Sequence, residues 1–251
     1  MRHDGKVAVV TGAGRNIGEA IAHRLADEGV AIAVVDLDQG RADKVVSDLT
    51  QRGVSAAAFV CDVSSPEQIE TTVGDIHAHY GRIDILVNNV AISDNKNILD
   101  IDLATWQRTL NITLTAPFYF AKCVAHKMVE DQTAGNIVNV SSTTGYFGRG
   151  RAIAYAAAKG GVVNLTRAMA IQLADYNIRV NSVVPNKIGS PVGKDDFDPS
   201  RPIVNLRNRA GVPNDLANAV AFLVSDQSDF IVGTDLFVDG GCSIIMPGGS
   251  G

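Results

Sequence analysis

The sequence has 251 residues, which is long enough for one large domain or two small ones with a substantial core. Its net charge of -5 at pH 7, with 46% hydrophobic and 20% charged residues, is typical of a soluble globular protein and argues against a nucleic-acid-binding protein. No apolar run approaches the roughly 18 residues that a membrane helix needs, and no signal peptide precedes the first apolar segment. We therefore expect a cytoplasmic protein with no membrane partner.

Short apolar runs alternate along the chain with longer segments of helical periodicity. The predicted strands are 7–10, 31–35, 57–61, 83–88, 136–140, 179–183 and 235–238. The predicted helices are 17–28, 39–52, 66–80, 103–128, 152–176 and 214–225. Strands that are apolar on both faces and separated by helices are typical of a parallel sheet covered on both sides. We predict an α/β fold, a single-domain Rossmann-like doubly wound parallel sheet of about seven strands over residues 1–246, with a flexible tail at 247–251.

A glycine-rich loop, TGAGRNIG at residues 11–18, lies between the first predicted strand and the first predicted helix. Its glycines allow a tight turn close to a pyrophosphate, and the helix N-terminus then favours that anion. Asp36 closes the second strand, where its carboxylate can accept both hydroxyls of an adenosine ribose and repel a 2′-phosphate. Arg15 has the opposite preference, but Leu37 supplies no second cation, so we expect NAD rather than NADP. The predicted contacts in the loop are Gly12, Arg15, Asn16, Ile17 and Gly18.

Tyr155 and Lys159 stand four residues apart and share one face of a predicted helix. A phenol titrates near pH ~10, and a neighbouring ammonium favours its anion, so the pair can move a proton at neutral pH. This spacing alone also occurs by chance on many helices. The cysteines Cys61, Cys123 and Cys242 form no CxxC pattern and predict neither a disulfide nor a metal site.

Further motifs follow the glycine-rich loop in a fixed order: Asp62-Val63, Leu86-Val87-Asn88-Asn89, Val140-Ser141-Ser142, Tyr155 with Lys159, Val184-Pro185 and Val238-Asp239-Gly240-Gly241. Together they closely resemble the short-chain dehydrogenase/reductase family over essentially the whole chain. The resemblance implies a Rossmann-like domain, a nicotinamide cofactor and reversible hydride transfer between an alcohol and a carbonyl. It also implies a homotetramer, or a homodimer, formed through the helices at 103–128 and 152–176.

The resemblance also assigns roles to single residues. Tyr155 would be the proton donor or acceptor, Lys159 the ribose ligand and phenol activator, and Ser142, 13 residues before Tyr155, the hydrogen-bond partner of the substrate oxygen. Loss of a hydride from a carbinol carbon must be matched by loss of the hydroxyl proton, which agrees with these roles. The remaining predicted cofactor contacts are Leu37, Asp62, Val63, Asn89, Pro185 and Ile188.

The chain departs from the family pattern at several positions. Thr113 stands where the family has the asparagine that holds a water behind the lysine. Asn111 is two residues earlier, about 200° around a helix, and cannot substitute without a local distortion. Thr113 is therefore the candidate for this catalytic position, and the proton route beyond Lys159 is open. The other departures are Asn16, Val90-Ala91, Asn186 and Ser190.

Two segments are predicted to line the substrate pocket: residues 143–154 and a lid loop at about 186–211. Apolar residues are sparse in the lid, which argues against a steroid pocket and favours a small polar substrate. A carboxylate or phosphate on that substrate could bind Arg149 or Arg151, although both arginines could instead be solvated or lie at a subunit contact. The candidate substrate contacts are Thr144, Tyr146, Arg149, Arg151 and Asn186.

Three functions follow from these observations. The first is an NAD-dependent alcohol dehydrogenase or carbonyl reductase of a small polar substrate. The second is a 3-oxoacyl thioester reductase, which predicts NADPH and is opposed by Asp36. The third is an NAD-binding sensor or scaffold with weakened catalysis, which Thr113, Val90 and Asn186 favour and the intact Ser142, Tyr155 and Lys159 oppose.

Overall fold

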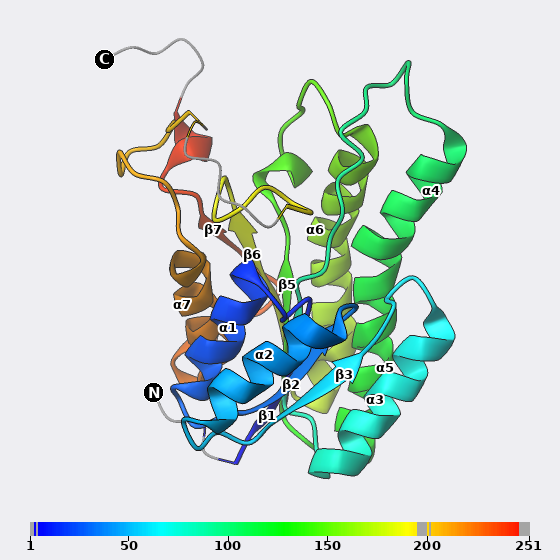
Figure 1. Ribbon diagram of the computed structural model, residues 1–251, viewed down its shortest axis with the longest axis vertical. Helices are drawn as coiled ribbons and strands as arrows, with labels where there is room; N and C mark the ends of the chain where they lie inside the picture. The colour runs from blue at the N-terminus through cyan, green and yellow to red at the C-terminus, as the bar shows by residue number, and fades with distance from the viewer. Residues whose placement is uncertain (1–2, 4, 195–199, 201, 246–251) are drawn as a thin grey trace.

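The computed structural model describes residues 3, 5–194, 200 and 202–245 (Figure 1). It contains a seven-stranded sheet in which every neighbouring pair is parallel, in the order β3-β2-β1-β4-β5-β6-β7. The strands are β1 (Val7–Thr11), β2 (Ala31–Asp36), β3 (Ala56–Val60), β4 (Ile85–Asn88), β5 (Gly135–Val140), β6 (Ile178–Pro185) and β7 (Asp235–Val238). The predicted Rossmann-like doubly wound sheet is confirmed.

Helices cover both faces of this sheet (Figure 1). One layer contains α1 (Asn16–Ala26), α2 (Gln39–Thr50) and α7 (Pro213–Leu223). The other contains α3 (Pro66–Tyr80), α4 (Leu103–Leu110), α5 (Ala116–Glu130) and α6 (Ile153–Leu173). Side-chain caps fix where three of them begin, because Asp38, Ser65 and Asp102 accept backbone N–H bonds at the starts of α2, α3 and α4.

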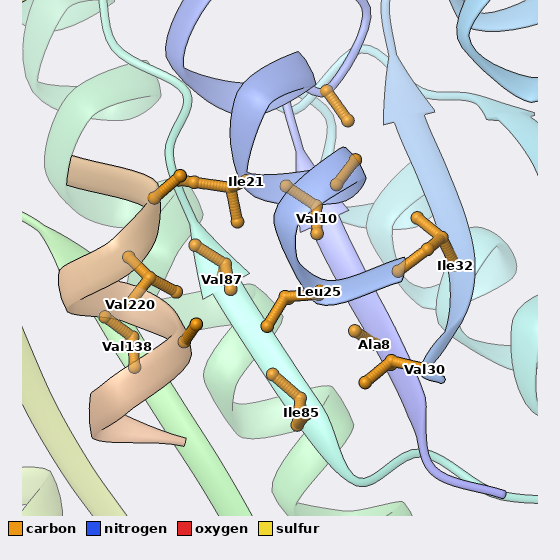
Figure 2. Packing of buried hydrophobic residues seen from close by; sticks show 14 of the residues in the cluster. Ala8, Val10, Ile21, Leu25, Val30, Ile32, Ile85, Val87, Val138 and Val220 are labelled. Atoms are coloured by element: carbon orange, nitrogen blue, oxygen red, sulfur yellow. The ribbon is translucent and has the colours of Figure 1, made fainter. Parts of the chain in front are cut away.

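The core between β1, α1 and α7 shows how the sequence pattern produces the layers (Figure 2). Ile21 and Leu25, four residues apart on α1, face the sheet, where they meet Val10 of β1 and Val220 of α7. All four side chains are fully buried. Val9 points to the opposite face and joins the second cluster. Burial of each such side chain stabilises the fold by about 1.5–3 kcal/mol, before the entropy lost on folding.

The strand order places the candidate ligand site. The chain passes from β1 outward to β2 and β3, and then returns to the other side of β1 as β4. Loops after β1 and β4 therefore leave the sheet in opposite directions, and a crevice forms at the carboxyl ends of these two strands.

The predicted helix over 103–128 is wrong in one respect, because a π-helical turn at Asn111–Thr115 separates α4 from α5. Pro117 has no N–H to donate to the carbonyl of Thr113, and its ring crowds that carbonyl. The wider turn relieves this conflict, and such turns often occur at functional sites. Asn111 could replace the family's asparagine only if the helix were locally distorted, and the π-helical turn is such a distortion. The side chain of Asn111 is nevertheless exposed.

Two other predicted boundaries also shift for physical reasons. The strand predicted at 83–88 begins at Ile85, because the Asp84 carboxylate accepts a bond from the Val7 N–H at 2.9 Å and pairs with Arg82. The helix predicted at 152–176 begins at Ile153, after Ala152 in a left-handed conformation, and ends at Leu173 before a 3-10 turn. The other predicted elements end within two residues of the observed ones.

Parts of two predicted segments lie outside the described residues. These are the tail at 247–251 and, within the predicted lid at 186–211, residues 195–199 and 201. In the part of the chain that the structure describes, no helix has the length and apolarity needed to cross a membrane.

Candidate active site

A cavity of about 990 Å³ opens at the carboxyl edge of the sheet, and loops that follow all seven strands contribute to its wall. Ser142, Tyr155 and Lys159 line it together. All the predicted cofactor residues also line it: Gly12, Arg15, Asn16, Ile17, Gly18, Asp36, Leu37, Asp62, Val63, Asn89, Pro185 and Ile188, besides Tyr155 and Lys159. The fold thus gathers residues that are up to 176 positions apart, from Gly12 to Ile188, around one space.

The glycine-rich loop depends on close backbone packing. A Cβ atom on Gly18 would lie 2.0 Å from the Gly12 carbonyl oxygen, and Gly12 itself has φ +62°. The Asn89 amide donates to the carbonyls of Thr11 and Gly12 at 3.0 and 3.2 Å, which fastens the loop to the chain after β4. A side chain on Gly18 would displace the backbone of Gly12, and one on Gly12 would be strained by the positive φ and would press on the side chains of Val90 and Asn89. The loop is therefore packed against the N-terminus of α1, where an anion is favoured.

Two of the departures from the family pattern contact each other. Asn16 has φ 53°, a left-handed conformation that asparagine tolerates better than most residues. Its side chain forms long hydrogen bonds with the backbone of Ser190, accepting from the N–H at 3.4 Å and donating to the carbonyl at 3.5 Å. The nucleotide loop is therefore tied to the segment that follows β6.

The carboxylate of Asp36 is held at the end of β2 by two backbone groups. Its oxygens accept from the N–H groups of Gly14 at 2.9 Å and Asp38 at 3.1 Å. Arg41 is the second cation at this end of the cavity, and the sequence did not indicate it. Arg41 and Asp36 both pack against Gly14: a Cβ atom on that glycine would lie 2.7 Å from Arg41 Cβ and 2.8 Å from Asp36 Oδ2. Burial, and then the charge of Arg41, lower the pKa of Arg15, while Asp36 raises it. Arg15 and Arg41 thus line the same end of the cavity as Asp36.

Ser142 follows β5, whereas Tyr155 and Lys159 are in the first two turns of α6, and all three side chains are buried. Burial raises the pKa of Tyr155, while a hydrogen bond with the Ser142 hydroxyl and the charge of Arg149 both lower it. The Lys159 ammonium donates to the Val140 carbonyl at 2.6 Å and lies 5.8 Å from the centre of the Tyr155 ring. Burial lowers the pKa of Lys159 to about 7.

Thr113 has a different environment from these three residues. Its fully buried hydroxyl accepts from the Ile92 N–H and donates to the Ile92 carbonyl, each at 3.2 Å. Among the described residues Thr113 is not part of the cavity wall. The hydroxyl therefore fixes the backbone after β4, and its predicted catalytic role has no support from a contact with the cavity.

The candidate substrate contacts divide into two groups. Thr144, Arg149 and Asn186 line the cavity, whereas Tyr146 and Arg151 lie outside its wall as the described residues define it. The Tyr146 ring packs against Phe237, with 4.9 Å between ring centres. Burial and a hydrogen bond with Asp235 raise the pKa of Tyr146.

Other lining residues divide into two groups. Phe147, Lys187, Val192 and Lys194 fall in the two segments predicted to line the substrate pocket, whereas Arg41, Arg108, Cys242 and Ile245 were missed from the sequence. Cys242 and Ile245 follow β7, and the carboxyl end of that strand could have indicated them. The Cys242 sulfur accepts a hydrogen bond from the Asn186 amide at 3.1 Å.

This arrangement has a defined chemical capacity. The glycine-rich loop and Asp36 fit the pyrophosphate and the ribose of a dinucleotide. The hydroxyls of Ser142 and Tyr155 meet in the same cavity, where they can hold a substrate oxygen and exchange a proton with it.

Comparison with known proteins agrees with this geometry. Residues 12–243 match the protein family described as enoyl-(acyl carrier protein) reductase. A 2-dehydro-3-deoxy-D-gluconate 5-dehydrogenase of Formosa agariphila is 36% identical over 244 residues, 94% of this chain and 92% of the relative. A 3-oxoacyl-[acyl-carrier-protein] reductase of Thermotoga maritima is 34% identical over 247 residues, 97% of this chain and 100% of the relative. The crystal structure of an NAD+-bound xylitol dehydrogenase, 35% identical, covers 96% of this chain and 100% of its own with a TM-score of 0.89.

The buried ammonium of Lys159 leads to a prediction about stability. Its pKa falls from 10.5 to about 7 on folding, so between these pH values the unfolded chain binds more protons at this group than the folded chain. The destabilising contribution of Lys159 therefore decreases as the pH increases from 7 towards 10. We expect Lys159→Met to remove this contribution, so that its melting temperature exceeds that of the wild type most near pH 7 and least near pH 10.

Thermal unfolding at several pH values between 7 and 10 measures this difference. Lys122→Met, which replaces an exposed lysine of α5, is the matched control. A Lys159→Met difference that is constant over the whole range would contradict the prediction.

Proposed function

Because this chain belongs to the short-chain dehydrogenase/reductase family, we propose that it is an NAD-dependent dehydrogenase or carbonyl reductase of a small, polar, anionic substrate. The observation that carries the proposal is the meeting of the Ser142 and Tyr155 hydroxyls, with Lys159 beside them, in the cavity that the glycine-rich loop also lines. A bound nicotinamide would supply the hydride acceptor or donor for this chemistry.

The residues of the chain have separate tasks in this reaction. Gly12 and Gly18 keep the first loop free of side chains where a pyrophosphate must approach the backbone. During oxidation of an alcohol, the hydride leaves the carbinol carbon while Tyr155 accepts the hydroxyl proton, so that two electrons and one proton are removed with the hydride and one further proton is removed at the oxygen. Ser142 donates a hydrogen bond to the substrate oxygen, and Lys159, when protonated, favours the phenolate.

Replacement of the proposed proton acceptor tests the function directly. We expect Tyr155→Phe to lower kcat by about 10²–10⁴-fold, because it removes the acidic and basic group but keeps the ring. NAD+ binding should persist, since the glycine-rich loop and Asp36 are untouched. The measurement is NADH formation with a panel of hydroxy acids, polyols and sugars, alongside NAD+ titration.

Tyr146→Phe is the matched control, because this second tyrosine packs against Phe237 outside the cavity wall defined by the described residues. Full turnover by Tyr155→Phe would refute the assigned role. Tight NAD+ binding by the wild type with no turnover across the panel would instead favour the sensor or scaffold.

The preference for NAD rests on Asp36. Its carboxylate is oriented by two backbone N–H groups and would repel a 2′-phosphate, although Arg15 and Arg41 beside it would attract one. Removal of one charge can therefore change which of the two cofactors the site prefers. The cofactor preference also distinguishes the proposed dehydrogenase from a 3-oxoacyl thioester reductase, for which NADPH is predicted.

We expect Asp36→Asn to move the ratio of the NAD+ and NADP+ dissociation constants towards NADP+ by at least about tenfold, because about 1.4 kcal/mol of charge repulsion is sufficient for this change. Addition of Arg41→Ala to the Asp36→Asn variant should weaken NADP+ binding more than NAD+ binding. Isothermal titration with both cofactors measures the ratio. Tighter binding of NADP+ than of NAD+ by the wild type would contradict the assignment and favour the thioester reductase.

An anionic substrate is inferred from the cations on the substrate side. Arg149, Lys187 and Lys194 line the cavity, and the charge of Arg149 acts on the pKa of Tyr155. Arg149 therefore shares the cavity with Tyr155 and acts on it electrostatically. The F. agariphila relative is named for a gluconate derivative, which carries a carboxylate.

We expect Arg149→Ala to raise the KM of an acidic substrate by about 10–100-fold, which corresponds to about 1.5–3 kcal/mol for a hydrogen bond to a charged group. The KM of a neutral polyol should change much less, and this comparison corrects for any effect on Tyr155. Arg151→Ala is the control, since Arg151 lies outside the wall that the described residues form. An unchanged KM for the acid would refute the anion contact.

We also infer a homotetramer formed through the outer surfaces of α4, α5 and α6. Apolar side chains are exposed on these helices, among them Leu103, Phe118 and Ile171. The mass in solution from light scattering tests this inference.

A further inference from the structure

The catalytic helix α6 begins without a cap of its own. Ala152 occupies the N-cap position with φ 66° and ψ 55°, and its side chain cannot accept a hydrogen bond. Ala152, Ala154 and Tyr155 are buried, so water does not readily reach the first N–H groups of the helix. These groups need partners from elsewhere in the protein.

The chain between β4 and α4 supplies those partners. The Lys96 carbonyl accepts from the N–H groups of Ala152 at 2.7 Å and Ile153 at 3.4 Å. The Asp94 carboxylate accepts from the N–H of Tyr155 at 3.0 Å, and its other oxygen accepts from the N–H of Lys96 at 3.3 Å. Figure 1 shows this segment running beside the start of α6. One carboxylate thus holds both the helix and the turn that supports it.

The same segment is fastened on its other side. Thr113, in the π-helical turn between α4 and α5, bonds to both backbone groups of Ile92. A continuous set of contacts therefore runs from this turn through Ile92 and Asp94 to the backbone of Tyr155. Movement of the segment would be transmitted to the start of α6.

We propose that Asp94 is a positioning residue, whose carboxylate replaces the missing N-cap of α6 and sets the place of Tyr155 relative to Ser142. The inference rests on the proposed function, in which Tyr155 exchanges a proton with the substrate. Ser142 is anchored separately, because it follows β5 and accepts from the Thr144 N–H at 3.1 Å. The distance between the two hydroxyls therefore depends on where α6 begins.

Three physical effects support this role. A carboxylate at a helix N-terminus is stabilised by the helix dipole and forms a charge-assisted hydrogen bond. Without it, the buried N–H of Tyr155 loses its partner. Ala152 also stores backbone strain in its left-handed conformation, which persists only while the surrounding contacts hold it.

The test compares Asp94→Ala with Asp94→Asn. Both variants lose the negative charge, but only asparagine keeps an oxygen that can accept from the Tyr155 N–H. We expect Asp94→Ala to lower kcat by about 10–100-fold, because a displacement near 1 Å is enough for such a loss. Asp94→Asn should stay within about threefold of the wild type, and both should keep the wild-type affinity for NAD+. Asp100→Ala, which removes a carboxylate that bonds to Asn97 within the same segment, is the control.

The pH profile distinguishes positioning from partial unfolding. Burial raises the pKa of Tyr155, while Ser142 and Arg149 lower it, so displacement of the phenol changes the balance of these effects. The midpoint of the pH–rate profile for alcohol oxidation should therefore differ between Asp94→Ala and the wild type but stay at the wild-type value in Asp94→Asn. A smaller fraction of folded enzyme would lower the rate but leave this midpoint unchanged, and that result would overturn the proposal.

Hydrogen exchange gives a measurement that does not require activity. Amides at 152–156 should exchange faster in Asp94→Ala and at nearly the wild-type rate in Asp94→Asn. If the wild type turns over no substrate, the proposed function fails while exchange still tests the cap. Equal exchange and equal kcat in the two variants would overturn the cap. If Asp94→Ala does not fold, the same comparison is made with Ala152→Gly added to both variants, because glycine adopts the left-handed conformation without strain.

Discussion

The chain that leaves β4 is bonded at four successive points, and the geometry of the site depends on these bonds. The Asn88 amide donates to Asn139 at the end of β5, and that of Asn89 to the first loop at Thr11. Ile92 is held by Thr113, and Asp94 accepts from the Tyr155 N–H at the start of α6. The glycine-rich loop, the sheet and α6 thus share one support. This support lies between β1 and β4, where the strand order reverses. The reversal sets the position of the cavity, and the segment that leaves β4 there also aligns the walls of the cavity.

The interior of the sheet and its carboxyl edge differ in the kind of groups that they bury. The interior is made of apolar side chains such as Leu25 and Val87, which are fully buried and stabilise the fold. At the carboxyl edge the chain instead buries the Lys159 ammonium against one carbonyl and leaves the Ser141 hydroxyl buried with no hydrogen bond among the described residues. Groups buried in this way destabilise the protein. The large apolar core offsets this cost, and perturbed groups of this kind are typical of active sites.

Most of the fold could be predicted from the amino-acid sequence, because strands and helices are specified by patterns among residues that are close together in the chain. Apolar runs and helical periodicity specify the strands and helices, and the glycine-rich loop follows from its position between β1 and α1. The features that were missed depend on contacts between distant segments or on local turns. The π-helical turn follows from Pro117 and the bond from Thr113 to Ile92, and Arg41 lies near the Asp36 end of the cavity because Asp38 caps the start of α2 there. Tyr146, four residues after Ser142, lies beside Phe237 because the 3-10 turn at Thr143–Gly145 redirects the chain.

The departures from the family pattern have an ordered structural basis. Asn16 bonds to Ser190, which is itself a departure, and Thr113 bonds to both backbone groups of Ile92. Asn186 donates to Cys242 at the cavity wall. Random loss of function would be expected to leave such polar groups unpaired or the neighbouring backbone without support. Here the side chains of Asn16, Thr113 and Asn186 each have a partner that fastens a loop of the site. This pattern favours retention of catalysis with an altered substrate pocket over a protein that only binds the dinucleotide.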